Sequence, residues 1–164
     1  MKGKLIVFEG PDGVGKSTLA EKLRHRLTEE GRDVTLESFP GRTPNSLGEW
    51  VYSLHHDVKS TLGSNAKQAL HIAAHIDAIE RIILPKICSG ATVILDRFYW
   101  STLAYGHVFG ANRILLDHLV AAEKEVWGEV APDILFLIDR PQAFRQEHPQ
   151  QVYDSLRRAY AQLS

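Results

Sequence analysis

The sequence predicts an α/β protein of three layers, in which helices cover both faces of a mostly parallel sheet. The main observation is an alternation of short apolar runs, typical of strands buried on both faces, with longer segments that have the spacing of amphipathic helices. A glycine-rich turn also joins the first apolar run directly to a helical pattern. Strands and helices in this order usually form a parallel sheet with right-handed crossovers.

Four segments have the composition of strands. The first is the continuous apolar run of residues 5–8, which Gly10 closes. The other three read DVTLESF, ATVILD and ILFLI, at residues 33–39, 91–96 and 134–138. Ligands of open parallel sheets bind beyond the carboxyl ends of the strands. The turn after the first strand therefore lies where a ligand is expected.

Longer segments between the strands carry helical patterns. The first starts at Ser17, repeats leucine every fourth residue and stops at Gly31. Residues 66–88 predict one long helix, and Asn112 is placed to cap a helix over residues 113–127. In the last segment, one helical face carries Val152, Leu156, Ala159 and Leu163.

Length and composition indicate one soluble domain over residues 1–164. The formal net charge of −1 gives no basis for a nucleic-acid surface or an anionic membrane partner. No apolar run approaches the roughly 20 residues that span a bilayer, and the apolar patch near the N-terminus is short for a signal peptide. Cys88 is the only cysteine, which fits a reducing compartment, so we expect a cytoplasmic protein.

Residues 10–17 match the phosphate-binding pattern G-x-x-x-x-G-K-[ST], between a predicted strand and a predicted helix as that pattern requires. Glycines let successive N–H groups turn toward phosphate oxygens, and the helix N-terminus adds partial positive charge. Lys16 would reach the β- and γ-phosphates, and the Ser17 hydroxyl would ligate Mg²⁺. The predicted nucleotide-binding residues are Gly10, Pro11, Asp12, Gly13, Val14, Gly15, Lys16, Ser17 and Thr18. The alternative is a chance glycine turn, which is rare in a chain of this length.

The motif indicates a nucleoside triphosphate as ligand. The presence or absence of other motifs indicates which class of nucleotide-binding protein this is. GTPase switch proteins read their base with N-K-x-D, and transporter ATPases contain L-S-G-G-Q. The sequence contains neither pattern. A kinase is therefore the main expectation.

Asp96 and Arg97 stand where the third predicted strand ends. A carboxylate there can hold Mg²⁺ directly or through water, and the adjacent guanidinium can bridge the phosphates of donor and acceptor. A structural salt bridge is the alternative. We predict Lys16, Asp96 and Arg97 as catalytic residues, and Ser17 and Asp96 as metal ligands.

Five stretches together resemble the thymidylate kinase family of nucleoside monophosphate kinases. They read FEGPDGVGKST, FPGRTPNSLGE, ATVILDRFYWSTLAYG, PDILFLID and VYDSLRRAYAQLS, in the family's order and at nearly its spacing. The resemblance implies a P-loop kinase fold, ATP and Mg²⁺ as cofactors, and a nucleoside monophosphate as acceptor. It also implies a two-fold homodimer and a role in nucleotide biosynthesis.

The resemblance assigns Asp12, Arg42, Arg97, Ser101 and Tyr105 to the acceptor site. Asp12 would touch the sugar of the acceptor and help to position its phosphate. Arg42 would lie near that phosphate, and Arg97 would contact the phosphates during transfer. Glu9 matches a family position too, although a plain strand-end carboxylate explains it equally well.

Some positions differ from the family in ways that concern the acceptor. The family usually has an aromatic residue and then an arginine on the long helix, where Ile72 and Ile76 stand here. Gly106 stands where an amide or hydroxyl often helps to read thymine. His75, beside the place of the lost arginine, is a candidate acceptor contact. These differences predict relaxed or shifted acceptor choice.

The segment over residues 139–149 is short for the family's lid. In family members with glycine at the position of Gly13, a lid arginine normally neutralises the transferring phosphate. Arg140 and Arg145 are the candidates, and we predict Arg145 as catalytic, the alternative for each being an ordinary solvated charge. The family would place a fifth strand and a final helix after Ser164, so we expect the C-terminal strand to be missing.

The sequence as a whole predicts a kinase that moves the γ-phosphate of ATP to dTMP or a related deoxynucleotide. Two alternatives stay open. One is a P-loop kinase for another small acceptor, such as a nucleoside. The other is a nucleotide-binding protein with little transferase activity, which a short lid would explain. No nucleic-acid or membrane partner is expected.

Overall fold

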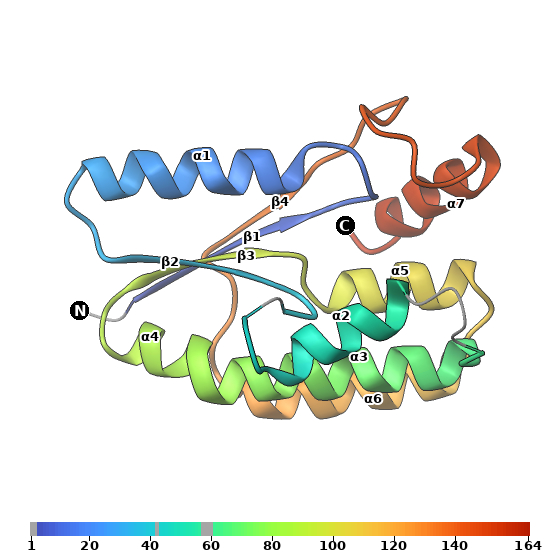
Figure 1. Cartoon of the computed structure of the whole chain (residues 1–164), viewed down its shortest axis with the longest axis horizontal. Helices are drawn as coiled ribbons and strands as arrows, with labels where there is room; N and C mark the ends of the chain where they lie inside the picture. The colour runs from blue at the N-terminus through green and yellow to red at the C-terminus, as the bar shows by residue number, and fades with distance from the viewer. Residues whose placement is uncertain (1–2, 42, 57–60) are drawn as a thin grey trace.

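The computed structural model describes residues 3–41, 43–56 and 61–164, and it confirms the predicted α/β fold. Within these ranges the strands are β1 (Lys4–Glu9), β2 (Val34–Ser38), β3 (Thr92–Asp96) and β4 (Ile134–Leu137). They form one parallel sheet in the order β2-β3-β1-β4 (Figure 1). Each strand matches a predicted one to within a residue at either end. The described ranges contain no strand after β4, which lies at an edge of the sheet.

The register of the strands brings polar residues to one edge of the sheet. Phe8 of β1 and Ser38 of β2 both pair with Asp96 of β3, so these three strands end at nearly the same level. Glu9 extends β1 by one residue beyond this point. Because the strands are parallel, the connections that leave them start from the same edge, where ligands of such sheets bind.

Helices cover both faces of the sheet. In Figure 1, α1 (Lys16–Glu29) covers one face, and the other face is covered by α3 (Ser64–Ala78), α4 (Leu84–Cys88) and α6 (Arg113–Trp127), with α2 (Leu47–His56) packed on α3. α5 (Tyr99–Val108) and α7 (Gln150–Ala161) pack against each other near the carboxyl ends of the strands. The three-layer prediction is therefore confirmed.

Alternate residues of the strands supply the core on the two faces. On one face, Phe8 and Ile94 pack against Ala20 of α1. On the other face, the buried residues are Leu5, Val7, Phe39, Ile79, Ile83, Ile87, Val93, Leu95, Phe98 and Trp127. Strands buried on both faces explain why the apolar runs in the sequence are continuous.

The predicted helix over residues 66–88 is present but is not uniform. α3 passes into a π-helical turn, η1 (Ile79–Ile83), and then into α4. Pro85 is the second residue of α4, two positions after the end of this turn, and it has no N–H to donate the bond that a regular α-helix would need there. The wider turn thus coincides with the missing donor, while Ile79 and Ile83 stay buried.

Other elements follow the predictions in part. Asn112 caps α6 as predicted, because its side-chain oxygen accepts a hydrogen bond of 3.0 Å from the Leu115 N–H. α2 and α5 have no counterpart among the predicted elements, and α5 starts at a contact from a distant strand, described below. No helix in the described ranges combines the length and apolar character that crossing a membrane requires.

Candidate active site at the ends of the strands

The predicted phosphate loop connects β1 to α1. Gly10 and Gly13 have φ angles of 138° and 76°, which residues with side chains rarely adopt. A Cβ atom at Gly10 would lie 2.3 Å from the carbonyl oxygen of Ile138, and one at Gly13 would lie 1.9 Å from that of Arg145. Both glycines are therefore required by the backbone conformation and by the close approach of the chain after β4.

Lys16 opens α1 with its side chain turned back onto the loop. Its ammonium donates a hydrogen bond of 2.6 Å to the Pro11 carbonyl, and the residue is 5% exposed. Burial, together with the nearby Arg97 guanidinium, lowers the pKa of Lys16 to about 8. Phosphate oxygens in the loop would add negative charge and favour the protonated form.

Ser17 and Asp96 meet at the place where a metal ion was predicted. The Ser17 hydroxyl donates a hydrogen bond of 2.5 Å to Asp96 Oδ2. Asp96 Oδ1 is buried and has no hydrogen-bond partner among the described residues. Mg²⁺ prefers oxygen ligands and commonly binds a carboxylate and a hydroxyl beside nucleotide phosphates. These two residues therefore fit the ion.

Arg97 joins the end of β3 to the phosphate loop. Its Nη2 forms an ion pair with Asp12, and its Nη1 donates to Ser101 Oγ (2.9 Å) and more weakly to the Tyr160 hydroxyl (3.4 Å). Burial alone would raise the pKa of Asp12, but the Arg97 guanidinium and the Tyr105 hydroxyl hold it below its usual value. Asp12 is thus an ionised carboxylate over the ordinary pH range.

Tyr105 of α5 holds both the side chain and the backbone of Asp12. Its hydroxyl donates a hydrogen bond of 2.5 Å to Asp12 Oδ2 and accepts one of 3.0 Å from the Asp12 N–H. The Arg97 guanidinium also lies 5.2 Å from the centre of the Tyr105 ring. Burial raises the pKa of Tyr105 well above its usual value, so the phenol stays protonated and remains a donor.

Glu9 caps α5 from the end of β1. The carboxylate is fully buried and accepts hydrogen bonds from the backbone N–H groups of Phe98 (2.7 Å) and Ser101 (3.0 Å) and from the Ser101 hydroxyl (2.8 Å). These backbone groups belong to the first turn of α5, which has no partner of its own for them. Burial raises the pKa of Glu9, against the opposing effect of Arg97. Glu9 therefore sets the position of the helix that carries Ser101 and Tyr105.

The chain after β4 crosses the phosphate loop. Residues 139–149 form no regular helix or strand, and the Phe144 N–H donates a hydrogen bond of 2.9 Å to the Gly13 carbonyl. The Arg140 guanidinium lies 3.7 Å from the centre of the Phe144 ring, and Arg157 of α7 pairs with Asp139 at 2.6 Å. The predicted short lid therefore lies directly on the loop.

Residues 8–152 match the family model of thymidylate kinase. The chain belongs to the thymidylate kinase family. It is 40% identical over 138 residues to the thymidylate kinase of Chlorobaculum parvum, a match that covers 82% of this chain and 60% of that protein. Over 139 residues it is 40% identical to that of Chlamydia muridarum, covering 84% and 66%. The chain thus spans about 60–66% of the length of these relatives.

A longer match and a solved structure support the same assignment. The thymidylate kinase of Pseudomonas entomophila is 32% identical over 177 residues, covering 99% of this chain and 82% of that protein. The crystal structure of thymidylate kinase from Ehrlichia chaffeensis superposes with a TM-score of 0.81 at 31% identity, covering 99% of this chain and 85% of that one. The fold and the order of the elements are therefore those of the family.

Most predicted site residues of this family member gather in one place. The residues brought together at the carboxyl ends of β1 and β3 are Asp12, Lys16, Ser17, Asp96, Arg97, Ser101 and Tyr105. Arg42 lies outside the described residues.

His75 is not part of this group. Its ring is 2% exposed, stacks on Phe39 with centres 3.9 Å apart and pairs with Glu123 of α6 at 2.8 Å. The expected acceptor contact is therefore absent from this arrangement, because this face of α3 is turned into the core. Ile72 is also 2% exposed, and Ile76 is half-buried.

Gly106 faces a neighbouring helix. A Cβ atom at this position would lie 2.6 Å from the side chain of Leu116 in α6. Packing between α5 and α6 therefore accounts for the glycine, and a base-reading side chain could not extend from this place without moving α6.

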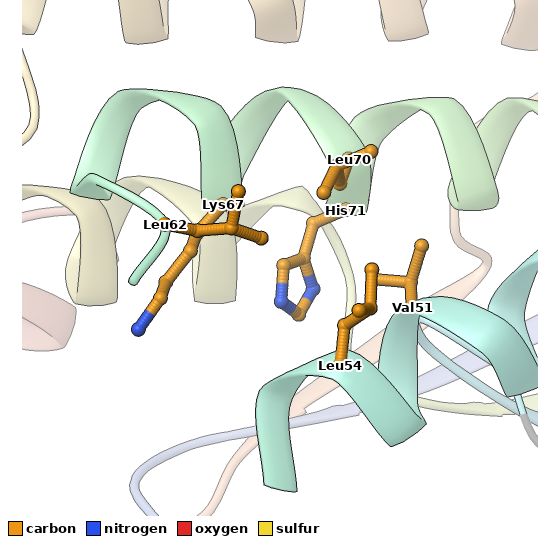
Figure 2. Close-up of a pocket in the computed structure, with 6 residues that line it drawn as sticks. All are labelled: Val51, Leu54, Leu62, Lys67, Leu70 and His71. Atoms are coloured by element: carbon orange, nitrogen blue, oxygen red, sulfur yellow. The ribbon is translucent and has the colours of Figure 1, made fainter. Parts of the chain in front are cut away.

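The groove between α2 and α3 is almost filled by side chains. Figure 2 shows His71 of α3 pointing toward Val51 and Leu54 of α2, beside Leu62. The remaining cavity of about 10 Å³ has room for about one water molecule. In this conformation the cavity is too small for a nucleotide.

The lid and α7 contribute residues that the sequence analysis did not assign. His148 Nε2 lies 3.4 Å from Asp12 Oδ2, whereas the Arg145 side chain is 81% exposed and pairs with Glu147. A polar cavity of about 260 Å³ lies between the lid and the loop, lined among others by Asp12, Gln142, Gln146, His148 and Tyr153.

Tyr160 of α7 is 1% exposed and its hydroxyl lies 2.7 Å from Ser101 Oγ. The signal for Tyr160 was its spacing of four residues from Leu156, on the buried face of the last helix.

Proposed function

We propose that this protein is a kinase that transfers the γ-phosphoryl group of ATP to a nucleoside monophosphate, with dTMP as the first acceptor to test. The observation that carries the proposal is the convergence of Asp96 and Arg97 on Ser17 and Asp12 of the phosphate loop. This arrangement sets a cation site and a guanidinium fork beside a phosphate cradle. Membership of the thymidylate kinase family supports the same reaction.

The loop would bind the triphosphate through its backbone N–H groups and the N-terminus of α1. Lys16 would leave the Pro11 carbonyl and donate to the β- and γ-phosphates, a short movement within the same loop. Ser17 and Asp96 would hold Mg²⁺, which supplies charge neutralisation at the phosphates when it is bound.

Arg97 would place the acceptor phosphate in line with the γ-phosphate. Its Nη2 now pairs with one oxygen of Asp12, and a dianionic phosphate could replace this contact and present two oxygens to the planar fork. Ser101 and Tyr105 then line the sugar of the acceptor. Such transfer needs positioning and charge neutralisation rather than covalent help, and these residues supply both.

The lid would contribute one further positive charge. We propose Arg145 for this role, which requires that its guanidinium exchange Glu147 for the transferring phosphate. The exchange is inexpensive because an exposed ion pair of this kind contributes about 0–1 kcal/mol. Arg42 is retained as a contact to the acceptor phosphate.

A panel of acceptors tests the proposal. Purified protein with ATP and Mg²⁺ would be incubated with dTMP, dUMP, other nucleoside monophosphates and nucleosides, and product would be separated by chromatography. Lys16→Ala serves as the matched control for contaminating kinases. Activity on nucleosides alone would favour a nucleoside kinase, and ATP binding without product on any acceptor would favour a nucleotide-binding protein.

Family membership is also the ground for two further proposals, a two-fold homodimer and a place in the cytoplasm. Sedimentation equilibrium over a range of concentrations tests the first, since a monomer at all concentrations would contradict it. Fluorescence microscopy of a tagged chain in its own cells tests the second.

A further inference from the structure

A buried carboxylate lies in the layer of helices below the sheet, away from the residues assigned to the reaction. Glu123 of α6 is 0% exposed. One carboxylate oxygen, Oε2, lies 2.8 Å from Nδ1 of His75, and the other, Oε1, accepts a hydrogen bond of 3.1 Å from the Trp127 indole N–H. His75 and Trp127 are themselves 2% and 4% exposed. Both oxygens are therefore engaged, each by an aromatic ring.

Each of these two rings packs on a phenylalanine that borders the D-R pair. His75 stacks on Phe39, with ring centres 3.9 Å apart and planes inclined by 11°. Trp127 packs on Phe98, with ring centres 5.4 Å apart and planes inclined by 53°. Glu123 thus bonds His75 of α3 and Trp127 of α6. Through these rings it is linked to Phe39, which follows β2, and to Phe98, which lies just after β3.

The two phenylalanines are tied to the backbone of the site. The Phe39 N–H donates a hydrogen bond of 3.0 Å to the carbonyl of Asp96. Phe98 directly follows Arg97, and its N–H donates 2.7 Å to Glu9. Phe39 and Phe98 therefore hold the segment that carries Asp96 and Arg97 from both sides. Their rings pack on His75 and Trp127, the two residues that bond Glu123.

The segment needs such support. Arg97 has a φ angle of 78°, a conformation that a residue with a side chain holds only when its surroundings impose it. A buried carboxylate, in turn, is costly to desolvate, and apolar residues of similar volume often serve the fold as well. An apolar residue here could not bond the ring nitrogen atoms of His75 and Trp127, which together with packing on Phe39 and Phe98 hold the orientation of both rings.

We propose that Glu123 is a positioning residue for Asp96 and Arg97, acting through His75 on Phe39 and through Trp127 on Phe98. The proposal deepens the proposed function and rests on it, because positioning matters only if Arg97 handles phosphates. The role of Glu123 is to keep the Arg97 guanidinium in the orientation that contacts the transferring phosphoryl group. Misplacement of a reacting group by about 1 Å can cost about a hundredfold in rate.

The main test compares Glu123→Leu with a control on the same helix, Val120→Ala. Val120 is a buried apolar residue of α6 that cannot hydrogen-bond either ring, so its truncation should destabilise the protein while leaving the bonds of Glu123 to His75 and Trp127 in place. For Glu123→Leu we expect kcat to fall between about tenfold and a hundredfold, with KM for both nucleotides changed less than about threefold. Val120→Ala should lower the melting temperature and leave kcat near the original value. Equal kcat in the original protein and Glu123→Leu would overturn the proposal.

Milder variants keep the test informative if Glu123→Leu fails to fold. Trp127→Phe keeps an aromatic ring and removes the indole donor, and Glu123→Gln keeps the shape but can accept from only one of the two rings. Both should lower kcat, and Glu123→Gln should retain more activity than Glu123→Leu. Unchanged kcat in both variants would contradict the positioning role.

A second readout does not depend on activity. The Nε–H resonance of Arg97, assigned in the NMR spectrum with Arg97→Lys, reports the surroundings of the guanidinium. Glu123→Gln should shift this resonance, whereas Val120→Ala should not. If the original protein phosphorylates no acceptor but the resonance shifts, the positioning is supported and the proposed function fails. If the protein is active and the resonance and kcat are both unchanged, the positioning fails and the function stands.

Discussion

Arg97 and Asp12 form an ion pair that joins the end of β3 to the phosphate loop, although the two residues are 85 positions apart in the sequence. Tyr105 and Ser101 of α5 hold the two members of this pair, and Glu9 holds α5 in turn. The pair therefore connects the loop that would bind the donor with the helix that would line the acceptor. A phosphate that binds Arg97 would compete with Asp12 for the guanidinium Nη2.

Removal of the loop ammonium should abolish transfer without harming the fold. Lys16→Met keeps the apolar stem and deletes the charge that compensates the phosphates, so kcat/KM for ATP should fall more than about a hundredfold. Because folding lowers the pKa of Lys16 to about 8, the buried ammonium destabilises the folded state. This cost is full below about pH 8 and disappears as the pH rises to the higher pKa of the unfolded chain. Thermal unfolding at pH 7 should therefore show a variant at least as stable as the original protein. Near-native turnover would remove Lys16 from the mechanism.

The same lysine predicts a pH dependence. Only the protonated ammonium compensates phosphate charge, and the pKa of Lys16 is lowered to about 8. Because kcat/KM reports ionisations of the free enzyme, its value for ATP should be steady below this pH and fall above it. Lys16→Arg stays charged and should show no such fall, whatever its absolute rate. A flat profile up to about pH 10 in the original protein would contradict the assignment.

Arg97 should be needed as a planar fork and not only as a charge. Arg97→Ala should lower kcat by a factor of about a hundred or more, which corresponds to about 3 kcal/mol of transition-state stabilisation. Arg97→Lys should recover little, because an ammonium cannot contact two phosphates at once in the same geometry. Steady-state kinetics on the best acceptor measures both. Full recovery with lysine would indicate electrostatic attraction alone.

The lid arginine can be tested against its own ion-pair partner. Arg145→Ala should lower kcat about tenfold and leave thermal stability unchanged, because the side chain is 81% exposed. Glu147→Gln releases the same guanidinium, so kcat should stay equal or rise. If Arg145→Ala matches the original protein in kcat, the lid charge has no part in transfer and His148, 3.4 Å from Asp12, becomes the residue to replace next.

Acceptor choice should be relaxed. If the long helix aligns with the family as the sequence predicts, Ile72 and Ile76 replace an aromatic residue and an arginine, and an apolar pocket discriminates small differences by only about 1–3 kcal/mol. We expect kcat/KM for dTMP to lie within about tenfold of that for dUMP. Ile76→Arg, at a half-buried position, should improve the use of dTMP. Ile72→Phe is unsuitable because Ile72 is 2% exposed and a larger ring would overpack the core.

A strong native preference for dTMP that Ile76→Arg leaves unimproved would show that other residues read the base. It would also show that the family's positions on this helix are aligned wrongly to the sequence. His75, next to Ile76, faces the core and not the acceptor side.

The sequence by itself determined the features that depend on local spacing. The phosphate loop requires a fixed order of glycines, lysine and serine between a strand and a helix, and all of it lies within residues 7–23. The strands follow from apolar runs, and the cap of α6 follows from Asn112, whose partner Leu115 is three residues away. Such interactions are complete within a short window, so residue order alone predicts them.

Tertiary structure decided which side chains meet. Glu9 caps α5 from 89 and 92 residues away, and Glu123 pairs with His75 across 48 residues, so no local pattern announces either contact. The same holds for Tyr160. In the sequence it is one more residue on the apolar face of an amphipathic helix, and only the packing of α7 on α5 brings its hydroxyl to Ser101. These contacts depend on the register of the sheet and on the rotation of each helix about its axis. Both are set by packing of the whole core, because a turn of one helical position exchanges a buried face for an exposed one.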